Sequence, residues 1–137
     1  MRQLTMLFFI CLCIGCSTSK KTGTNFLNGT WVPINQEIGG TVLPKTAFEN
    51  QKLIINDSTY TFNAESIDKG VVKYGNDKMD IYGKEGVNVG KHFTAIYKFE
   101  NEQLTICYNL SGDSYPGTFE TKGKPRYFLS VFKKESM

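Results

Sequence analysis

Three stretches of alternating apolar and polar residues, each broken at its centre by a two-residue turn, restrict the fold of this 137-residue chain more than any other feature. The turns are Asp57-Ser58, Asn76-Asp77 and Asn101-Glu102. Two-residue turns of such polar residues between alternating runs are typical of β-hairpins. From Gly29 onward the pattern offers no helical apolar stripe of useful length, so we expect an all-β domain.

Each turn predicts a register for its hairpin, and in all three hairpins the register collects apolar pairs on one face. The expected pairs are Leu53 with Phe62, Ile55 with Tyr60, Val72 with Ile81, Tyr74 with Met79, Phe93 with Leu110, Ala95 with Tyr108, Tyr97 with Ile106, and Phe99 with Leu104. On the other face of the second hairpin, Lys73 falls opposite Asp80, where an ion pair is expected. On the other face of the third hairpin lie His92 and Cys107.

A first strand around residues 30–35 and a last strand over 126–133 bring the number of main strands to eight. Residues 41–50 are expected to include a short helical turn with Pro44 near its start, and residues 118–121 are expected to add an edge segment. Eight sequential antiparallel strands bury their apolar faces in a closed up-and-down barrel, in which residues 30–35 pair with 129–134. A β-sandwich is the alternative, because periodicity does not report closure.

The first 16 residues have the composition of a bacterial export signal. Arg2 precedes an apolar run over residues 4–14 that is shorter than the about 20 residues a membrane-spanning helix needs. The segment Leu12-Cys13-Ile14-Gly15-Cys16 resembles the lipobox of bacterial lipoproteins, although Cys13 stands where Leu is usual. We therefore predict a signal peptide over 1–15 and acylation of Cys16; a plain signal peptide is the alternative.

Acylation would place the mature chain on a membrane surface. The polar residues that follow suit a flexible tether over 16–26, and the barrel domain is expected over 27–135. No acidic cluster follows Cys16. We expect a cell-envelope protein that is bound to the membrane through its lipid anchor, on the periplasmic side of the outer membrane.

Three segments resemble a known family. The stretch Leu27-Asn28-Gly29-Thr30-Trp31 contains the G-x-W of the lipocalin signature. Together with Ala95–Cys107 and Phe128–Glu135, it is similar to the lipocalin-like family of uncharacterised bacterial domains first noted in planctomycetes. The resemblance implies a lipocalin-like barrel and little about activity, because fold does not fix function.

The resemblance also implies that Trp31 closes one end of the barrel. Lipocalins usually stack an arginine on this tryptophan, but here the antiparallel first and last strands bring Lys133 or Lys134 towards it, so a lysine is expected over the indole.

Five inward-facing side chains are candidate ligand contacts: Phe62, Phe93, Tyr97, Ile106 and Tyr108. They could instead fill the barrel, and the number of large aromatic residues favours filling, whereas analogy with lipocalins favours a cup for a small apolar ligand. Such a cup should enclose roughly 300 Å³ or more and be mainly apolar. A filled barrel would act through its surface, as a structural or protein-interaction module of the envelope.

Other functions have less support in the sequence. The net charge of +3 is spread without runs, so nucleic-acid binding is not expected. The chain has no nucleophile elbow, phosphate loop or paired metal spacing, so neither an enzyme nor a metal or cofactor site is expected. His92 is interpreted as a solvated strand-end residue, and Asp57, Asp77 and Asp113 as turn residues. Cys107 would have no disulfide partner within the domain.

Overall fold

The computed structural model describes residues 24–136, which form a single antiparallel sheet and two short 3-10 helices. The strands are β1 (Gly29–Ile38), β2 (Thr41–Val42), β3 (Lys52–Asn56), β4 (Thr59–Asn63), β5 (Ile67–Gly75), β6 (Lys78–Glu85), β7 (His92–Glu100), β8 (Gln103–Asn109) and β9 (Tyr127–Lys134), and the 3-10 helices are η1 (Thr24–Leu27) and η2 (Lys45–Ala47). The predicted signal peptide over 1–15, Cys16 and most of the tether lie outside the described residues.

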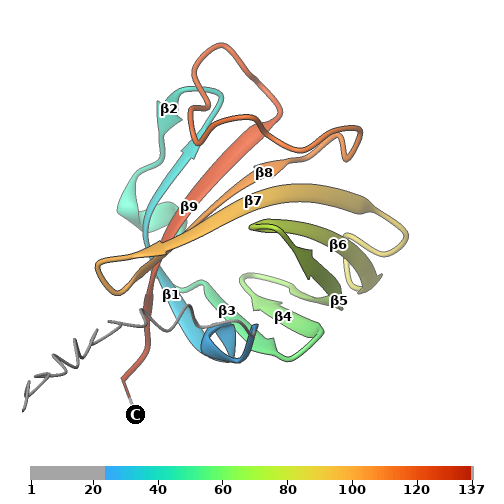
Figure 1. Ribbon diagram of the computed structural model, residues 1–137. Coiled ribbons are helices and arrows are strands. Elements are labelled where there is room, and N and C mark those ends of the chain that lie inside the picture. The colour runs from blue at the N-terminus through green and yellow to red at the C-terminus, as the bar shows by residue number, and fades with distance from the viewer. Residues whose placement is uncertain (1–23, 137) are drawn as a thin grey trace, which may run out of the picture.

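The sheet closes on itself, which confirms the up-and-down barrel and excludes the sandwich. Neighbouring strands follow the order β1-β3-β4-β5-β6-β7-β8-β9, and β1 pairs with β9 from Trp31 opposite Lys134 to Ile38 opposite Phe128. Figure 1 shows β7, β8 and β9 on one side of the barrel and β3, β4 and β5 on the other. The additional strand β2 pairs with the last residues of β1 and lies outside the closed ring of eight.

The hairpin registers agree with those expected from the sequence, with one exception. Leu53 pairs with Phe62, Tyr74 with Met79, and the β7–β8 ladder runs as predicted. Both central residues of the second and third turns have positive φ, between 50° and 61°, which is the backbone conformation of tight two-residue hairpin turns. This turn geometry fixes the register of each hairpin. The exception is Phe93 with Leu110, since β8 ends at Asn109 and the Leu110 amide bonds to the carbonyl oxygen of Arg126.

The segment after β1 contains the expected helical turn. Helix η2 covers Lys45–Ala47 and is preceded by Pro44 in an extended conformation. Proline suits this position because its fixed φ and missing amide cost nothing before the first turn.

The ion pair predicted between Lys73 and Asp80 is not formed, although the two residues pair in register as expected. The Lys73 ammonium lies over the ring of Tyr82, 5.4 Å from its centroid. The Asp80 carboxylate instead accepts hydrogen bonds from His92 and Tyr115. His92 and Tyr115 therefore take the place of the exposed Lys73 as partners of Asp80.

The outer face of β7 and β8 is covered rather than solvated, which sequence periodicity did not indicate. The connection over residues 110–126 packs against it: Asn109 Nδ2 donates to the Ser114 carbonyl oxygen over 2.9 Å, and Lys98 lies over the ring of Phe119. As a result Cys107 is fully buried. The edge strand expected over 118–121 is absent from this connection, where Thr121 is instead buried and bonds to the Gly40 amide.

His92 is the strand-end residue that was expected, since it begins β7, but it is only partly solvated. Its ring stacks on Tyr82 with a centroid separation of 4.6 Å and an interplanar angle of 8°. Its Nε2 lies 2.8 Å from Asp80 Oδ1, and its side chain is 37% exposed. The reason is cross-strand pairing, because Tyr82 and His92 lie opposite each other in the β6–β7 ladder.

One end of the barrel is closed by Trp31 and its neighbours. Trp31 is 1% exposed, and its indole Nε1 donates to the carbonyl oxygen of Leu27 in η1 over 2.7 Å. Phe99 meets the indole edge-on at 6.1 Å. The Lys134 ammonium lies 5.4 Å from the centre of the ring, so the expected lysine does take the place over the indole.

Candidate ligand-binding cavity

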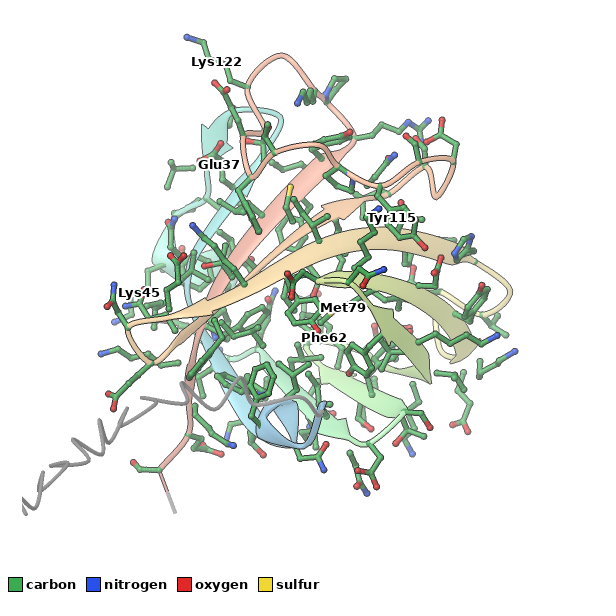
Figure 2. All side chains as sticks on the ribbon, in the orientation of Figure 1. Glu37, Lys45, Phe62, Met79, Tyr115 and Lys122 are labelled. Carbon is green, nitrogen blue, oxygen red and sulfur yellow. The ribbon has the colours of Figure 1, made fainter. Side chains whose placement is uncertain are left out.

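The barrel encloses a cavity of about 460 Å³. Its walls come from β3 to β9, and most of the lining side chains are apolar, among them Phe62, Met79, Ile81, Phe93, Ile106 and Phe128. In Figure 2, Phe62 and Met79 lie between the two sides of the barrel, whereas Tyr115 lies on the outside, beside β7. The volume exceeds the roughly 300 Å³ expected for a small ligand, and the lining is mainly apolar, as expected.

The cavity opens at the end of the barrel opposite Trp31. Its rim includes Asn88 and Lys91 from the β6–β7 loop, and Leu110 and Arg126 from the two ends of the β8–β9 connection. These loops lie at the end of the barrel opposite the three two-residue hairpin turns. The expectation that aromatic side chains mostly fill the interior therefore holds only for the end closed by Trp31.

Four of the five candidate ligand contacts line this cavity: Phe62, Phe93, Ile106 and Tyr108. The fifth, Tyr97, is not among the lining residues. Its ring packs edge-on against Tyr74, with centroids 6.1 Å apart and an interplanar angle of 81°. Tyr97 thus supports a wall residue instead of lining the cavity itself.

Sequence reasoning missed two tyrosines and one carboxylate of the lining, although the signal for them was present. Tyr60 and Tyr74 pair with Ile55 and Met79, so the hairpin registers already placed both on the inward face. Extending the alternation of β5 back from Val72 would have placed Gly70 and Asp68 on that face as well. Tyr60, Tyr74 and Asp68 all line the cavity.

Gly70 makes room for the Tyr60 ring. The two residues are paired between β4 and β5, and a Cβ on Gly70 would lie 2.7 Å from Tyr60 Cε1 and 2.9 Å from its hydroxyl oxygen. A Cβ there would also lie 2.1 Å from the backbone carbonyl oxygen of Tyr82, so any other residue at position 70 would displace both strand β6 and the Tyr60 ring. The glycine therefore lets Tyr60 lie across the inner surface of the sheet.

The hydroxyl groups of three lining tyrosines, Tyr60, Tyr74 and Tyr108, form no hydrogen bond with any described residue. Among the described residues, Tyr74 Oη is the one fully buried side-chain oxygen or nitrogen without a partner. Burial raises the pKa of Tyr74 and of Tyr108 well above the ordinary value for tyrosine, and proximity to Tyr74 and Tyr60 raises the pKa of Tyr108 further. All three hydroxyls are therefore protonated at neutral pH and can donate as well as accept.

At the rim, Asp68 holds the β6–β7 loop in place. It is 5% exposed, and its two oxygens accept from the backbone amide and the side-chain amide of Asn88, over 3.2 Å and 3.0 Å. Gly86, with φ of +89°, allows the loop to pass close to this carboxylate. Lys91 and Arg126 are exposed at the same rim, so the mouth carries two cations and one bonded carboxylate.

A polar cluster on the outside of the barrel joins the β8–β9 connection to β6 and β7. Tyr115 and His92 both donate to Asp80, and these bonds lower the pKa of that carboxyl group despite the opposing effect of desolvation. Because an ionised carboxylate only accepts, the His92 Nε2 carries the proton in this pair. The cluster therefore holds the β8–β9 connection against β6 and β7.

A larger hollow, about 550 Å³, lies beside the closed end. It is lined by Phe26, Trp31 and Phe99 together with five polar or charged residues of the β7–β8 turn and strands β8 and β9. Its volume alone does not make it the better ligand site, because a small apolar ligand requires a concave, mainly apolar surface.

Over residues 24–136, no three His, Cys, Asp or Glu side chains lie close enough together to hold a metal ion. Neither of the two helices in this part of the chain is long and apolar enough to cross a membrane.

No family model matches the chain, and neither the curated proteins nor the solved structures include one that is significantly similar to it. Membership of the lipocalin-like bacterial family therefore stays a prediction. The cavity is the observation from which a function can be argued.

Proposed function

We propose that this protein is an envelope lipoprotein whose barrel binds a small, mainly apolar molecule. The observation that carries the proposal is the cavity of about 460 Å³, lined mainly by apolar side chains and open at one end. Ligand sites are typically concave and mostly apolar, with a few polar groups that fix orientation. Eight-stranded barrels are just wide enough to hold one small ligand.

Burial of apolar surface supplies the driving force for such binding. A molecule that enters the cup removes its own apolar surface and that of Phe62, Phe93 and Phe128 from water, at about 25 cal/mol per Å². The closed end is already packed by Trp31 and Phe99, so the ligand need not stabilise the fold.

The membrane anchor is part of the proposal and rests on the sequence of the leader. Acylation of Cys16 would hold the barrel at the periplasmic face of the outer membrane, close to a source of apolar molecules. A fatty-acid probe should label the wild-type chain in cells and the Cys13→Ser variant, and should not label Cys16→Ser. Equal labelling of Cys16→Ser and the wild type would refute the anchor.

Ligand binding can be tested with the neutral dye N-phenyl-1-naphthylamine, whose fluorescence rises in apolar surroundings. Val72 is 3% exposed and lines the cavity, so Val72→Phe should fill the space and abolish saturable dye binding. Val42 is 62% exposed on β2, outside the closed ring, so Val42→Phe is a matched control that should bind as the wild type does. The proposal fails if the wild type gives no saturable signal or if Val72→Phe binds equally well.

A second candidate function, docking to an envelope protein partner, has one observation in its favour. Three apolar side chains are more than half exposed at the open end: Ile67 (57%), Val87 (64%) and Val89 (61%). They belong to neighbouring segments, since a Cβ on Gly86 would lie 2.4 Å from the Ile67 carbonyl oxygen. If the dye does not bind, co-purification of a protein that is lost on Val87→Ser and Val89→Ser would favour this second function.

A further inference from the structure

Three phenol groups without partners gather on the inner surface of a cavity that is otherwise mainly apolar. Tyr60 lies on the half of β4 nearest the closed end, Tyr74 lies on the corresponding half of β5, and Tyr108 lies on β8, on the half nearest the open end. All three side chains line the same cavity, and no hydrogen bond joins any of their hydroxyl groups to a described residue. A pure hydrocarbon ligand could form no hydrogen bond with these hydroxyl groups.

Tyr74 gives the sharpest reason to expect a polar atom on the ligand. Its hydroxyl is fully buried and has no hydrogen-bond partner. Leaving a buried hydroxyl unpaired costs about 1–3 kcal/mol, and unpaired buried groups in native structures call for a specific explanation. A ligand oxygen that comes within hydrogen-bond distance of Tyr74 Oη would recover that cost.

On the basis of the proposed function, we infer that the ligand carries an uncharged oxygen, as in an alcohol, a phenol or a carbonyl compound. This oxygen forms a hydrogen bond with the tyrosine cluster, which consists of Tyr60, Tyr74 and Tyr108. An oxygen fits because neutral phenols both donate and accept.

Charge favours a neutral oxygen over an anion at this position. The cations Lys91 and Arg126 are exposed at the mouth, whereas the charged group that acts on Tyr60 is the Asp68 carboxylate. Burial raises the pKa of Tyr60, and the negative charge of Asp68 raises it further. The same potential that disfavours an ionised phenol there disfavours an anionic ligand group.

A matched pair of probes tests this inference on the full-length chain. The probes are 2-naphthol and 2-methylnaphthalene, which differ by a hydroxyl in place of a methyl group, and their affinities can be measured by calorimetry. Because burial of the methyl group also favours binding, the preference is measured as the ratio of the 2-naphthol affinity to the 2-methylnaphthalene affinity. One net hydrogen bond should make this ratio about tenfold higher in the wild type than in a variant without the pairing hydroxyl. At least one of the single variants Tyr60→Phe, Tyr74→Phe and Tyr108→Phe should lose this preference while still binding 2-methylnaphthalene.

Tyr97→Phe is the control, because Tyr97 packs against Tyr74 but does not line the cavity. It should keep the preference for 2-naphthol. An affinity ratio that is unchanged in all three cavity variants would overturn the inferred oxygen and leave the cup intact. If the wild type binds neither probe, the proposed function fails together with the inference.

Discussion

Replacement of Tyr74 by phenylalanine should stabilise the protein in the absence of ligand, although the substitution removes a polar group from a native structure. The hydroxyl is fully buried and unpaired, so the folded state bears a desolvation cost that the unfolded chain does not. Removing the unpaired hydroxyl recovers about 1–3 kcal/mol of desolvation cost, and the small cavity left by the missing oxygen offsets part of this gain. We expect the free energy of unfolding to rise by about 1 kcal/mol.

Chemical denaturation with guanidinium chloride measures this change directly, provided that the slope of free energy against denaturant is the same in both proteins. A gain of about 1 kcal/mol corresponds to a rise of about 4 °C in Tm for a domain of this size. Tyr97→Phe is the control and should change the free energy by less than about 0.5 kcal/mol. A loss of about 1 kcal/mol or more in Tyr74→Phe would show that the hydroxyl is paired and would refute the reasoning.

Three further measurements test other parts of the structure. Trp31→Phe removes the bond to the Leu27 carbonyl oxygen and shrinks a buried ring, so it should cost about 2–4 kcal/mol in urea denaturation; a loss under about 0.5 kcal/mol would contradict the closure role. The pKa values of Tyr74 and Tyr108 are raised above 10.0 in the folded state, so the folded state binds more protons at high pH than the unfolded state does. The denaturation midpoint should therefore fall as the pH rises beyond about 10. An unchanged midpoint at about pH 11 would contradict the burial of these two tyrosines. Burial raises the pKa of Cys107 to about 11 and also closes the thiol to reagents. A thiol reagent at about pH 8 should therefore modify its peptide more than about a hundredfold more slowly in the folded than in the unfolded chain, as read by mass spectrometry, and comparable rates would show that residues 110–126 do not cover it.

The barrel could be predicted from the sequence because its determinants are local. Alternation with period two marks the inward face of each strand, and turns such as Asn76-Asp77 fix which residues face one another. Once the three registers are known, only closure remains undetermined, and the pairing of β1 with β9 settles it.

The covered outer face could not be predicted in the same way. The connection over 110–126 has no periodicity, so nothing in it indicates that Thr121 is buried or that Tyr115 bonds to Asp80. The burial of Cys107 depends on how this connection packs, and the loss of the Lys73–Asp80 pair depends in part on the bond between Asp80 and Tyr115, which are 35 residues apart.

The size of the cavity depends on side-chain placement that no pattern reports. Aromatic content favours filling, but the Tyr60 ring lies across Gly70 and Tyr97 packs behind Tyr74, so large side chains line the space or back its walls. Four of the five predicted contacts line the cavity because the register fixes which face they share. How far each ring extends along that face is a tertiary property.

Native mass spectrometry of the full chain purified from its own cells tests the central claim, that the barrel holds a small apolar molecule, most directly. We predict a population whose mass exceeds that of the denatured chain by one small molecule, which is released on collisional activation and is absent from Val72→Phe, where the added ring occupies the cavity. Val42→Phe should retain the molecule, since that residue lies outside the ring of eight strands. A wild-type chain that carries no additional mass and gains none when incubated with a lipid extract of the same cells would contradict the account.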